Sequence, residues 1–263
     1  MTAEARDARN GRLLPFAIPW ESIPWWALIL AVVGLFVGWS VFTSEAYLDA
    51  LAFIVDGVRL TLQVTLISYL IALVIGLIFG LMRVSDNPIF YAASTLYVEV
   101  MRGVPLLVVI LYMGFVVTPR LRDATGGQID LQGLPAAILG IAVSYGAYMA
   151  EVYRGGIESI ERGQMEAARS LGMNYMQAMR HVILPQAIRR ILPPLGNDLI
   201  SMLKDSSLIS VIALNDLLQT GRLYVSRTYR AFEGYNTVAL LYLTMTLILS
   251  FAVRIVERKA AIE

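Results

Sequence analysis

Four long uncharged runs of apolar residues constrain this chain more than any other feature of its sequence. They cover Ser22–Ser44, Leu60–Met82, Leu131–Ala150 and Tyr235–Val253. Crossing ~30 Å of hydrocarbon takes about 20 residues at 1.5 Å each, so each run is long enough to span a membrane as a helix. Only 16% of the residues are charged, whereas a soluble domain carries about 25%. We therefore predict an all-α, polytopic membrane protein.

Two further apolar segments, residues 88–118 and 187–214, are interrupted by polar residues and prolines. Glu99 and Arg102 precede Pro105 in the first segment. The second segment holds Pro193, Pro194, Asn197, Asp198, Lys204 and Asp205. We predict a broken helix in each, facing the interior of the bundle, because irregular backbone at membrane depth needs cover from protein or a water-filled cavity. The total is then about six spans.

The distribution of basic residues predicts the orientation of the chain. The run at Ser22–Ser44 begins after three arginines and lacks a small-residue cleavage site, which indicates a retained span and not a signal peptide. If six spans alternate from a cytoplasmic N-terminus, thirteen of the 21 Lys and Arg residues lie inside and six lie outside. Both termini are therefore expected in the cytoplasm. We divide the chain into an N-terminal tail (1–21), a transmembrane domain (22–258) and a C-terminal tail (259–263).

The residue composition excludes several functional classes. The chain has no Cys, which removes disulfides, thiolate metal sites and Cys nucleophiles. Its single histidine, His181, rules out a zinc site of several imidazoles and is most simply a surface residue. A net charge of +1 offers no field that would attract nucleic acid. No metal or nucleic-acid ligand is expected.

The longest polar stretch, residues 154–186, is predicted to form a helical loop in the cytoplasm. Glu166 to Leu171 are good helix formers, Gly172 suits a left-handed cap, and Asn174 can cap a second helix that runs to His181 and ends at Pro185. The loop has small residues for close approach, Ala167 and Ala168, and apolar anchors, Met165 and Leu171. This pattern favours a docking site for a partner. An interfacial helix lying on the lipid surface is the alternative.

The spacing of residues in this loop resembles the EAA loop of ABC importer permeases. Glu166-Ala167-Ala168 is followed after three residues by Gly172, and nine residues later by Val182-Ile183-Leu184-Pro185, where the family usually has Ile at the first position. Other stretches resemble the subfamily that imports polar amino acids: Glu99–Leu107, Ala147–Glu151 with Arg154-Gly155, Gly163-Gln164, and Ser201–Leu208. The resemblance covers roughly residues 55 to 258.

The resemblance implies a permease subunit with the five-span core of type I ABC importers and one additional N-terminal span. Such subunits lie in the bacterial cytoplasmic membrane, pair with an identical or homologous permease, and bind two ATP-binding cassette subunits and an extracytoplasmic solute-binding protein. The coupling helix would carry Glu166, Ala167, Ala168, Leu171 and Gly172. The chain has no G-x-x-x-x-G-K-[ST] motif, so ATP and Mg are expected on the partner and no cofactor on this chain. It would be a transport subunit and not an enzyme.

Charged residues within the spans are the candidates for a substrate path, because burying them in a membrane is costly. Glu99 and Arg102 lie three residues apart on one helix face and could meet both ends of a zwitterionic amino acid. Alternatively, they pair with each other or with another span, purely to fix the bundle. Asn197 and Asp198, expected at a half-helix end, are the second candidates.

Two other groups within the spans have less clear roles. The stretch Lys204–Ser207 either continues the path or marks a structural ion pair. Tyr148 and Glu151 suit a structural or gating role better than binding.

Two other classes of protein compete with the importer. A stand-alone, ion-coupled secondary transporter would need internal symmetry, and the two interrupted segments show only a loose likeness. A membrane-embedded hydrolase could use only Lys204 with Ser206 or Ser207 as base and nucleophile. Transport in liposomes under an ion gradient without an ATPase would favour the first of these, and intact uptake after mutating both serines would remove the second.

Overall fold

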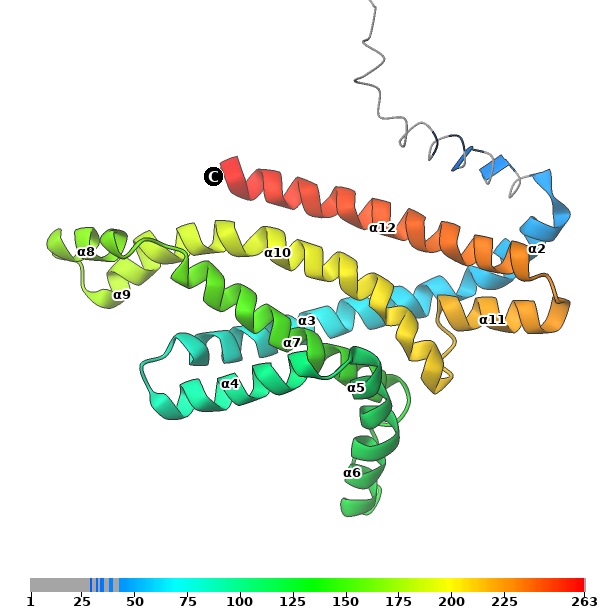
Figure 1. The fold of residues 1–263 in the computed structure, drawn as a ribbon, viewed down its shortest axis with the longest axis horizontal. Helices are drawn as coiled ribbons and strands as arrows, with labels where there is room; N and C mark the ends of the chain where they lie inside the picture. The colour runs from blue at the N-terminus through cyan, green and yellow to red at the C-terminus, as the bar shows by residue number, and fades with distance from the viewer. Residues whose placement is uncertain (1–28, 30–31, 33, 36–37, 40–42, 263) are drawn as a thin grey trace, which may run out of the picture.

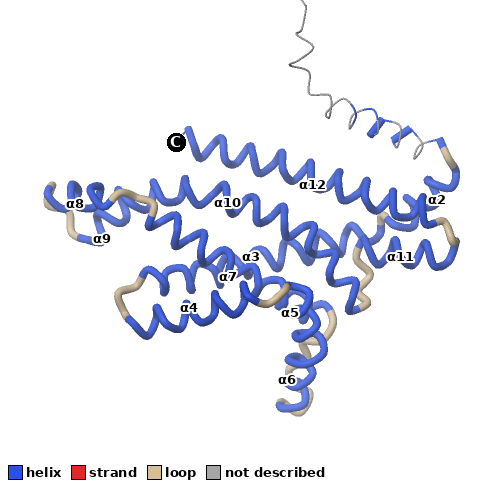
Figure 2. Tube along the Cα trace, in the orientation of Figure 1, coloured by secondary structure: helices blue, strands red, loops and turns tan. Residues whose placement is uncertain are grey.

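The computed structural model of the chain describes residues 29, 32, 34–35, 38–39 and 43–262. Every element in this part of the chain is a helix (Figures 1 and 2). The α-helices are α2 (Glu45–Ile54), α3 (Asp56–Val84), α4 (Pro88–Gly103), α5 (Leu106–Tyr112), α6 (Thr118–Ala124), α7 (Leu134–Glu158), α8 (Arg162–Ser170), α9 (Tyr175–Ala178), α10 (Leu184–Asp205), α11 (Leu217–Thr228) and α12 (Ala231–Ile262). Two π-helical turns, η4 (Met113–Val117) and η5 (Met179–Ile183), and a 3₁₀-helix, η6 (Ser206–Ile212), join some of them. The all-α prediction is confirmed.

Three of the predicted spans coincide with long apolar helices. By length and composition, Glu45–Val84, Leu134–Glu158 and Ala231–Arg258 can each cross a membrane. The bent pair α4 and α5–α6 counts as a fourth span if it is taken as one. The predicted run Ser22–Ser44 lies largely outside the described residues.

The predicted break in residues 88–118 is present. Helix α4 ends at Gly103, Val104 is extended, and the chain turns by 103° into the helix that begins at Leu106. The cause is local: Pro105 disfavours a helical conformation for the residue before it and cannot donate a backbone hydrogen bond.

The break in residues 187–214 does not lie at Pro193 and Pro194, and this corrects the prediction. Helix α10 continues through Pro193 and Pro194 and changes to a 3₁₀-helix only at Ser206. Adjacent prolines remove backbone bonds within a single turn, and both rings lie on the exposed side of α10, while Ile191 and Leu195 on the other side pack in the core. Asn197 and Asp198 therefore lie within a helix and not at a half-helix end.

Pro185 does not end the second loop helix either. The chain passes from α9 through the π-turn η5 directly into α10, with Pro185 in its first turn. Pro119 follows the π-turn η4 in the same way. A proline lacks the N–H for an i−4 bond and crowds that carbonyl, and a wider π-turn before it accommodates both effects without ending the helix.

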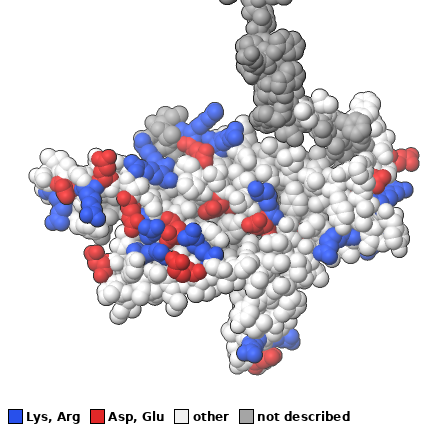
Figure 3. All heavy atoms as spheres, in the orientation of Figure 1, with Lys and Arg blue, Asp and Glu red and all other residues white. Residues whose placement is uncertain are grey.

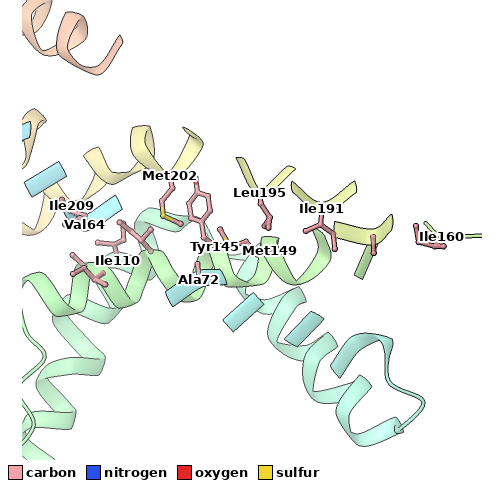
Figure 4. Packing of buried hydrophobic residues seen from close by; sticks show 14 of the residues in the cluster. Val64, Ala72, Ile110, Tyr145, Met149, Ile160, Ile191, Leu195, Met202 and Ile209 are labelled. Atoms are coloured by element: carbon pink, nitrogen blue, oxygen red, sulfur yellow. The ribbon is translucent and has the colours of Figure 1, made fainter. Parts of the chain in front are cut away.

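Helices α3 and α7 form the central pair of the bundle, and small residues let them approach closely. A Cβ atom on Gly76 of α3 would lie 2.6 Å from Cβ of Met149 on α7, and one on Gly80 would lie 2.8 Å from Cβ of Tyr153. The G-x-x-x-G spacing of these two glycines is typical of close helix contacts in membranes. Helix α10 packs on this pair through Ile191, Leu195 and Met202, and their side chains meet Ala72, Tyr145 and Met149 (Figure 4).

The two ends of the bundle differ. The α8–α9 hairpin and the turn between α3 and α4 lie at one end, and α2 and α11 lie at the other (Figure 1). Charged side chains of both signs gather over the half of the visible face that carries α4 and α8 (Figure 3). Most of the rest of that face is uncharged, as expected for a surface that contacts lipid.

Candidate functional site

Two short helices and a glycine corner form the projecting hairpin. Helix α8 ends at Ser170, and Gly172 then adopts φ +87°, a left-handed conformation that glycine reaches without strain. Asn174 begins α9 with a capping box: its side chain accepts from the backbone N–H of Gln177, and the Gln177 side chain accepts from the N–H of Asn174. The glycine corner and the Asn174 cap are as the sequence predicts.

The exposed side of the hairpin carries four of the five residues expected to couple to a partner. Glu166, Ala167, Leu171 and Gly172 are exposed, and 82% of the surface of Leu171 is accessible to solvent. Ala168 is the exception, because it is buried. An exposed leucine beside small residues is suited to a complementary apolar pocket on another protein.

A half-open pocket of about 310 Å³ lies between α5, α7 and α10. Most of its lining groups are polar or aromatic: Leu106, Ser144, Tyr145, Tyr148, Asp198, Ser201 and Asp205. The helical spacing explains the grouping, since Ser144, Tyr145 and Tyr148 share one face of α7 and Asp198, Ser201 and Asp205 share one face of α10.

Two carboxylates give the pocket a negative character. The Tyr145 hydroxyl donates a hydrogen bond of 2.7 Å to Oδ2 of Asp205. Oδ2 of Asp198 is buried and has no hydrogen-bond partner among the described residues, and the same holds for Oγ of Ser144. Buried polar atoms without partners are unfavourable unless a ligand or water satisfies them. The pocket is therefore equipped to receive a polar ligand with hydrogen-bond donors.

A cluster of ion pairs centred on Glu151 lies next to this pocket on α7. The Glu151 carboxylate lies 3.0 Å from Nε of Arg83, 2.8 Å from Nη2 of Arg154 and 3.8 Å from Nη1 of Arg102. Arg83 also lies 3.4 Å from Glu99. These contacts hold the ends of α3, α4 and α7 together.

The structure separates the residues that the sequence suggested for the substrate path. Asp198 lines the pocket, whereas Asn197 is exposed and does not. Glu99 and Arg102 do not pair with each other and do not line the pocket, because both belong to the cluster around Glu151.

The other residues that the sequence singled out, Lys204, Ser206 and His181, differ in their exposure to solvent. Lys204 and His181 are exposed. The Ser206 hydroxyl is buried and donates to the carbonyl of Leu203.

Sequence reasoning missed Ser144, Tyr145 and Ser201 as pocket residues and Arg83 and Arg154 as partners of Glu151. A signal for the first group was present: hydroxyl side chains recur at 144, 145 and 148 within an otherwise apolar span, and this spacing places them on one helix face. Arg154 follows Glu151 by three residues on α7, a spacing at which the two can pair. Arg83 and Arg102 come from other helices, and no pattern within one segment indicates them.

The described residues form an all-helical bundle with long apolar helices, a half-open polar pocket and a helical hairpin projecting from one end, which fits a membrane transport protein. Residues 72–262 match the family described as the binding-protein-dependent transport system inner membrane component. The chain belongs to this family, and it is thus a transport subunit of the inner membrane, as the resemblance implied.

Individual relatives are amino acid permeases. The chain is 35% identical over 221 residues to the glutamine transport system permease protein GlnP of Escherichia coli K12, covering 84% of this chain and 99% of GlnP. It is 34% identical to the arginine transport system permease protein ArtQ of Bacillus subtilis over 217 residues, covering 82% of this chain and 95% of ArtQ.

Solved structures show the same fold. A crystal structure of an amino acid ABC transporter with histidines superposes with a TM-score of 0.71 at 38% identity, covering 79% of this chain and 94% of that one. An inward-facing structure of the MetNI methionine ABC transporter has a TM-score of 0.67 at 27% identity, covering 83% of this chain and 99% of that one. The predicted type I importer fold is confirmed.

Proposed function

We propose that this chain forms the translocation path of an ATP-driven importer for a polar amino acid. The observation that carries the proposal is the half-open pocket of about 310 Å³ between α5, α7 and α10, which Asp198 and Asp205 line. An amino acid carries an ammonium group, and a buried carboxylate without a partner is its natural acceptor. The amino acid permeases among the relatives support the choice of cargo class.

The hairpin is the part of the chain through which ATP hydrolysis would act. Its exposed residues Glu166, Ala167 and Leu171 would dock into a cleft of an ATP-binding cassette subunit, which holds ATP and Mg. Alternating access would follow if the ATPases move together and rock two paired permeases, identical or homologous, between inward-open and outward-open states. The hairpin and both termini then lie in the cytoplasm, and a solute-binding protein delivers the amino acid from outside.

Reconstitution tests this proposal directly. The permease would be placed in liposomes with the ATPase and the binding protein encoded beside it, and ATP hydrolysis measured with L-glutamine, L-arginine, L-histidine and L-glutamate. At least one amino acid should stimulate hydrolysis and be taken up. Uptake driven by an ion gradient without the ATPase would contradict the proposal and favour a stand-alone transporter.

Charge reversal in the hairpin tests the coupling role. Glu166→Lys should abolish the stimulation and reduce recovery of the ATPase with the permease. Asp86→Lys is the matched control, because Asp86 is also an exposed acid, in the turn between α3 and α4 at the same end of the bundle. Equal effects of the two substitutions would count against docking at the hairpin.

A further inference from the structure

The pocket and the ion-pair cluster share one face of α7 and meet at Tyr148. Tyr145, Tyr148 and Glu151 follow one another at three-residue intervals, so they lie along one side of the helix within about 9 Å. Tyr148 lines the pocket, and the guanidinium carbon of Arg102 lies 5.5 Å from the centroid of its ring. Arg102 is thus the member of the cluster that lies beside a pocket residue.

Arg102 is also the arginine that Glu151 holds least closely. Its Nη1 lies 3.8 Å from the carboxylate, compared with 3.0 Å for Arg83 and 2.8 Å for Arg154. The Arg102 side chain is 43% exposed, whereas that of Arg83 is 12% exposed. If Arg102 moves away, Glu151 keeps two closer partners and stays neutralised. The Arg102 guanidinium is therefore free to take another anion at little cost.

The pocket itself lacks a cation. Its described lining includes Asp198 and Asp205 but no lysine or arginine. The carboxylate of an entering amino acid would meet only negative and neutral groups there, which is unfavourable in a low-dielectric interior. A cation must therefore come from beside the pocket. Lys204 is the other nearby cation. It directly precedes Asp205 on α10, so its side chain is turned by about 100° from that of Asp205. The Lys204 side chain is exposed.

We propose that Arg102 binds the carboxylate of the transported amino acid and leaves Glu151 in order to do so. The inference rests on the proposed function and adds a specific residue to it. Its consequence is competition: Glu151 and the cargo share one guanidinium, so occupancy of the pocket loosens the contact between α4 and α7. Arginine suits this exchange because its planar guanidinium can donate two parallel hydrogen bonds to a carboxylate.

A binding measurement on the permease with its ATPase subunits, without the binding protein, tests the exchange. The affinities of L-glutamine, L-arginine, L-histidine and L-glutamate would be measured by calorimetry, and the tightest ligand carried forward. Arg102→Gln should weaken its binding about tenfold, since a charge-assisted pair is lost. Glu151→Gln should strengthen it several-fold, because Arg102 no longer has a competing carboxylate.

The opposite signs are the decisive feature of the test. If Arg102 and Glu151 served only to hold the helices together, both substitutions would weaken binding and lower the thermal midpoint in parallel. One control accompanies them: Lys204→Gln, which removes the other nearby cation and should leave the affinity within about twofold. Arg154→Gln should weaken binding, because Glu151 then has one close partner fewer and holds Arg102 more tightly.

A change in the ligand gives an independent readout that does not depend on the folding of a variant. The carboxamide of the tightest amino acid lacks the negative charge, so it should bind the wild-type complex about tenfold more weakly than the acid. The Arg102→Gln variant should bind the two compounds equally.

Several outcomes would overturn the inference. Unchanged binding in Arg102→Gln, weakened binding in Glu151→Gln, or a tenfold loss in Lys204→Gln would each refute the exchange. Failure of the wild-type complex to bind any of the four amino acids would also refute it. The proposed function is tested separately, by stimulation of ATP hydrolysis with a loaded binding protein and by the dependence of uptake on the ATPase, so the two proposals can fail independently.

Discussion

Tyr145 and Asp205 connect α7 to α10 through a hydrogen bond of 2.7 Å, and both side chains line the half-open pocket. Asp205 is the last residue of α10, after which the chain changes to the 3₁₀-helix η6. The bond therefore fixes one wall of the pocket at the point where α10 ends. A contact between two helices at a ligand pocket is well placed to respond to the ligand.

Removing this hydroxyl should reduce transport without unfolding the protein. Tyr145→Phe leaves the ring in the core but takes the donor from Asp205, so the carboxylate gains freedom and the pocket loses a fixed wall. We expect uptake to fall about tenfold, measured in liposomes with the full importer. Tyr69→Phe is the matched control, since the Tyr69 hydroxyl also crosses to α10, bonding the carbonyl of Leu195, but does not line this pocket. Equal losses would mean that any bond between the helices suffices.

The parts of the fold set by local chemistry were predictable from the sequence. Uncharged runs indicated α3, α7 and α12, and the Gly172 and Asn174 signals located the corner of the hairpin. Pro105 marked a real break, because Val104 before it is extended. In each case the deciding interaction lies within a few residues of the chain.

The remaining features depend on contacts between segments far apart in the sequence. Pro193 and Pro194 read as a helix end, but packing of Ile191 and Leu195 keeps α10 continuous through them. The pocket needs α7 and α10 side by side, so the partner of Tyr145 could not be read from its own segment. Glu99 and Arg102 were expected to meet a ligand together or to pair with each other or with another span. The structure pairs each with a residue of another helix, Arg83 and Glu151, which only the fold brings close.

The close approach of α3 and α7 leads to a prediction about stability. Gly76→Ala would place a Cβ atom 2.6 Å from Cβ of Met149, so one helix must shift. Overpacking of this kind costs about 1–3 kcal/mol, and we expect a lower thermal midpoint in detergent, followed by circular dichroism or light scattering. Gly155→Ala is the control, because a Cβ there has nothing within 4 Å. A midpoint unchanged in both variants would contradict the tight packing.

The corner of the hairpin can be tested by the same type of substitution. Gly172→Ala forces a side chain into a conformation with φ +87°, at a cost of about 1–2 kcal/mol. The corner should relax and tilt α8, so less ATPase should be recovered with the permease. Gly163→Ala in α8 has a helical backbone and open space around it, and should leave recovery unchanged. The two variants are compared by pull-down of the ATPase at equal permease levels.

Ala213 offers a substitution that should stabilise the protein. It follows η6 with φ 60° and ψ 27°, a left-handed conformation that costs a residue with a side chain roughly 1–2 kcal/mol. Ala213→Gly removes this strain, and the greater freedom of glycine in the unfolded chain takes back about 0.5–1 kcal/mol. We expect a small rise in the thermal midpoint. Ala92→Gly makes the same chemical change at an exposed helical position of α4 and should lower the midpoint instead. Because the substitution is identical, the difference in sign isolates the backbone conformation as the cause, and shifts in the same direction would show that the turn at Ala213 carries no strain.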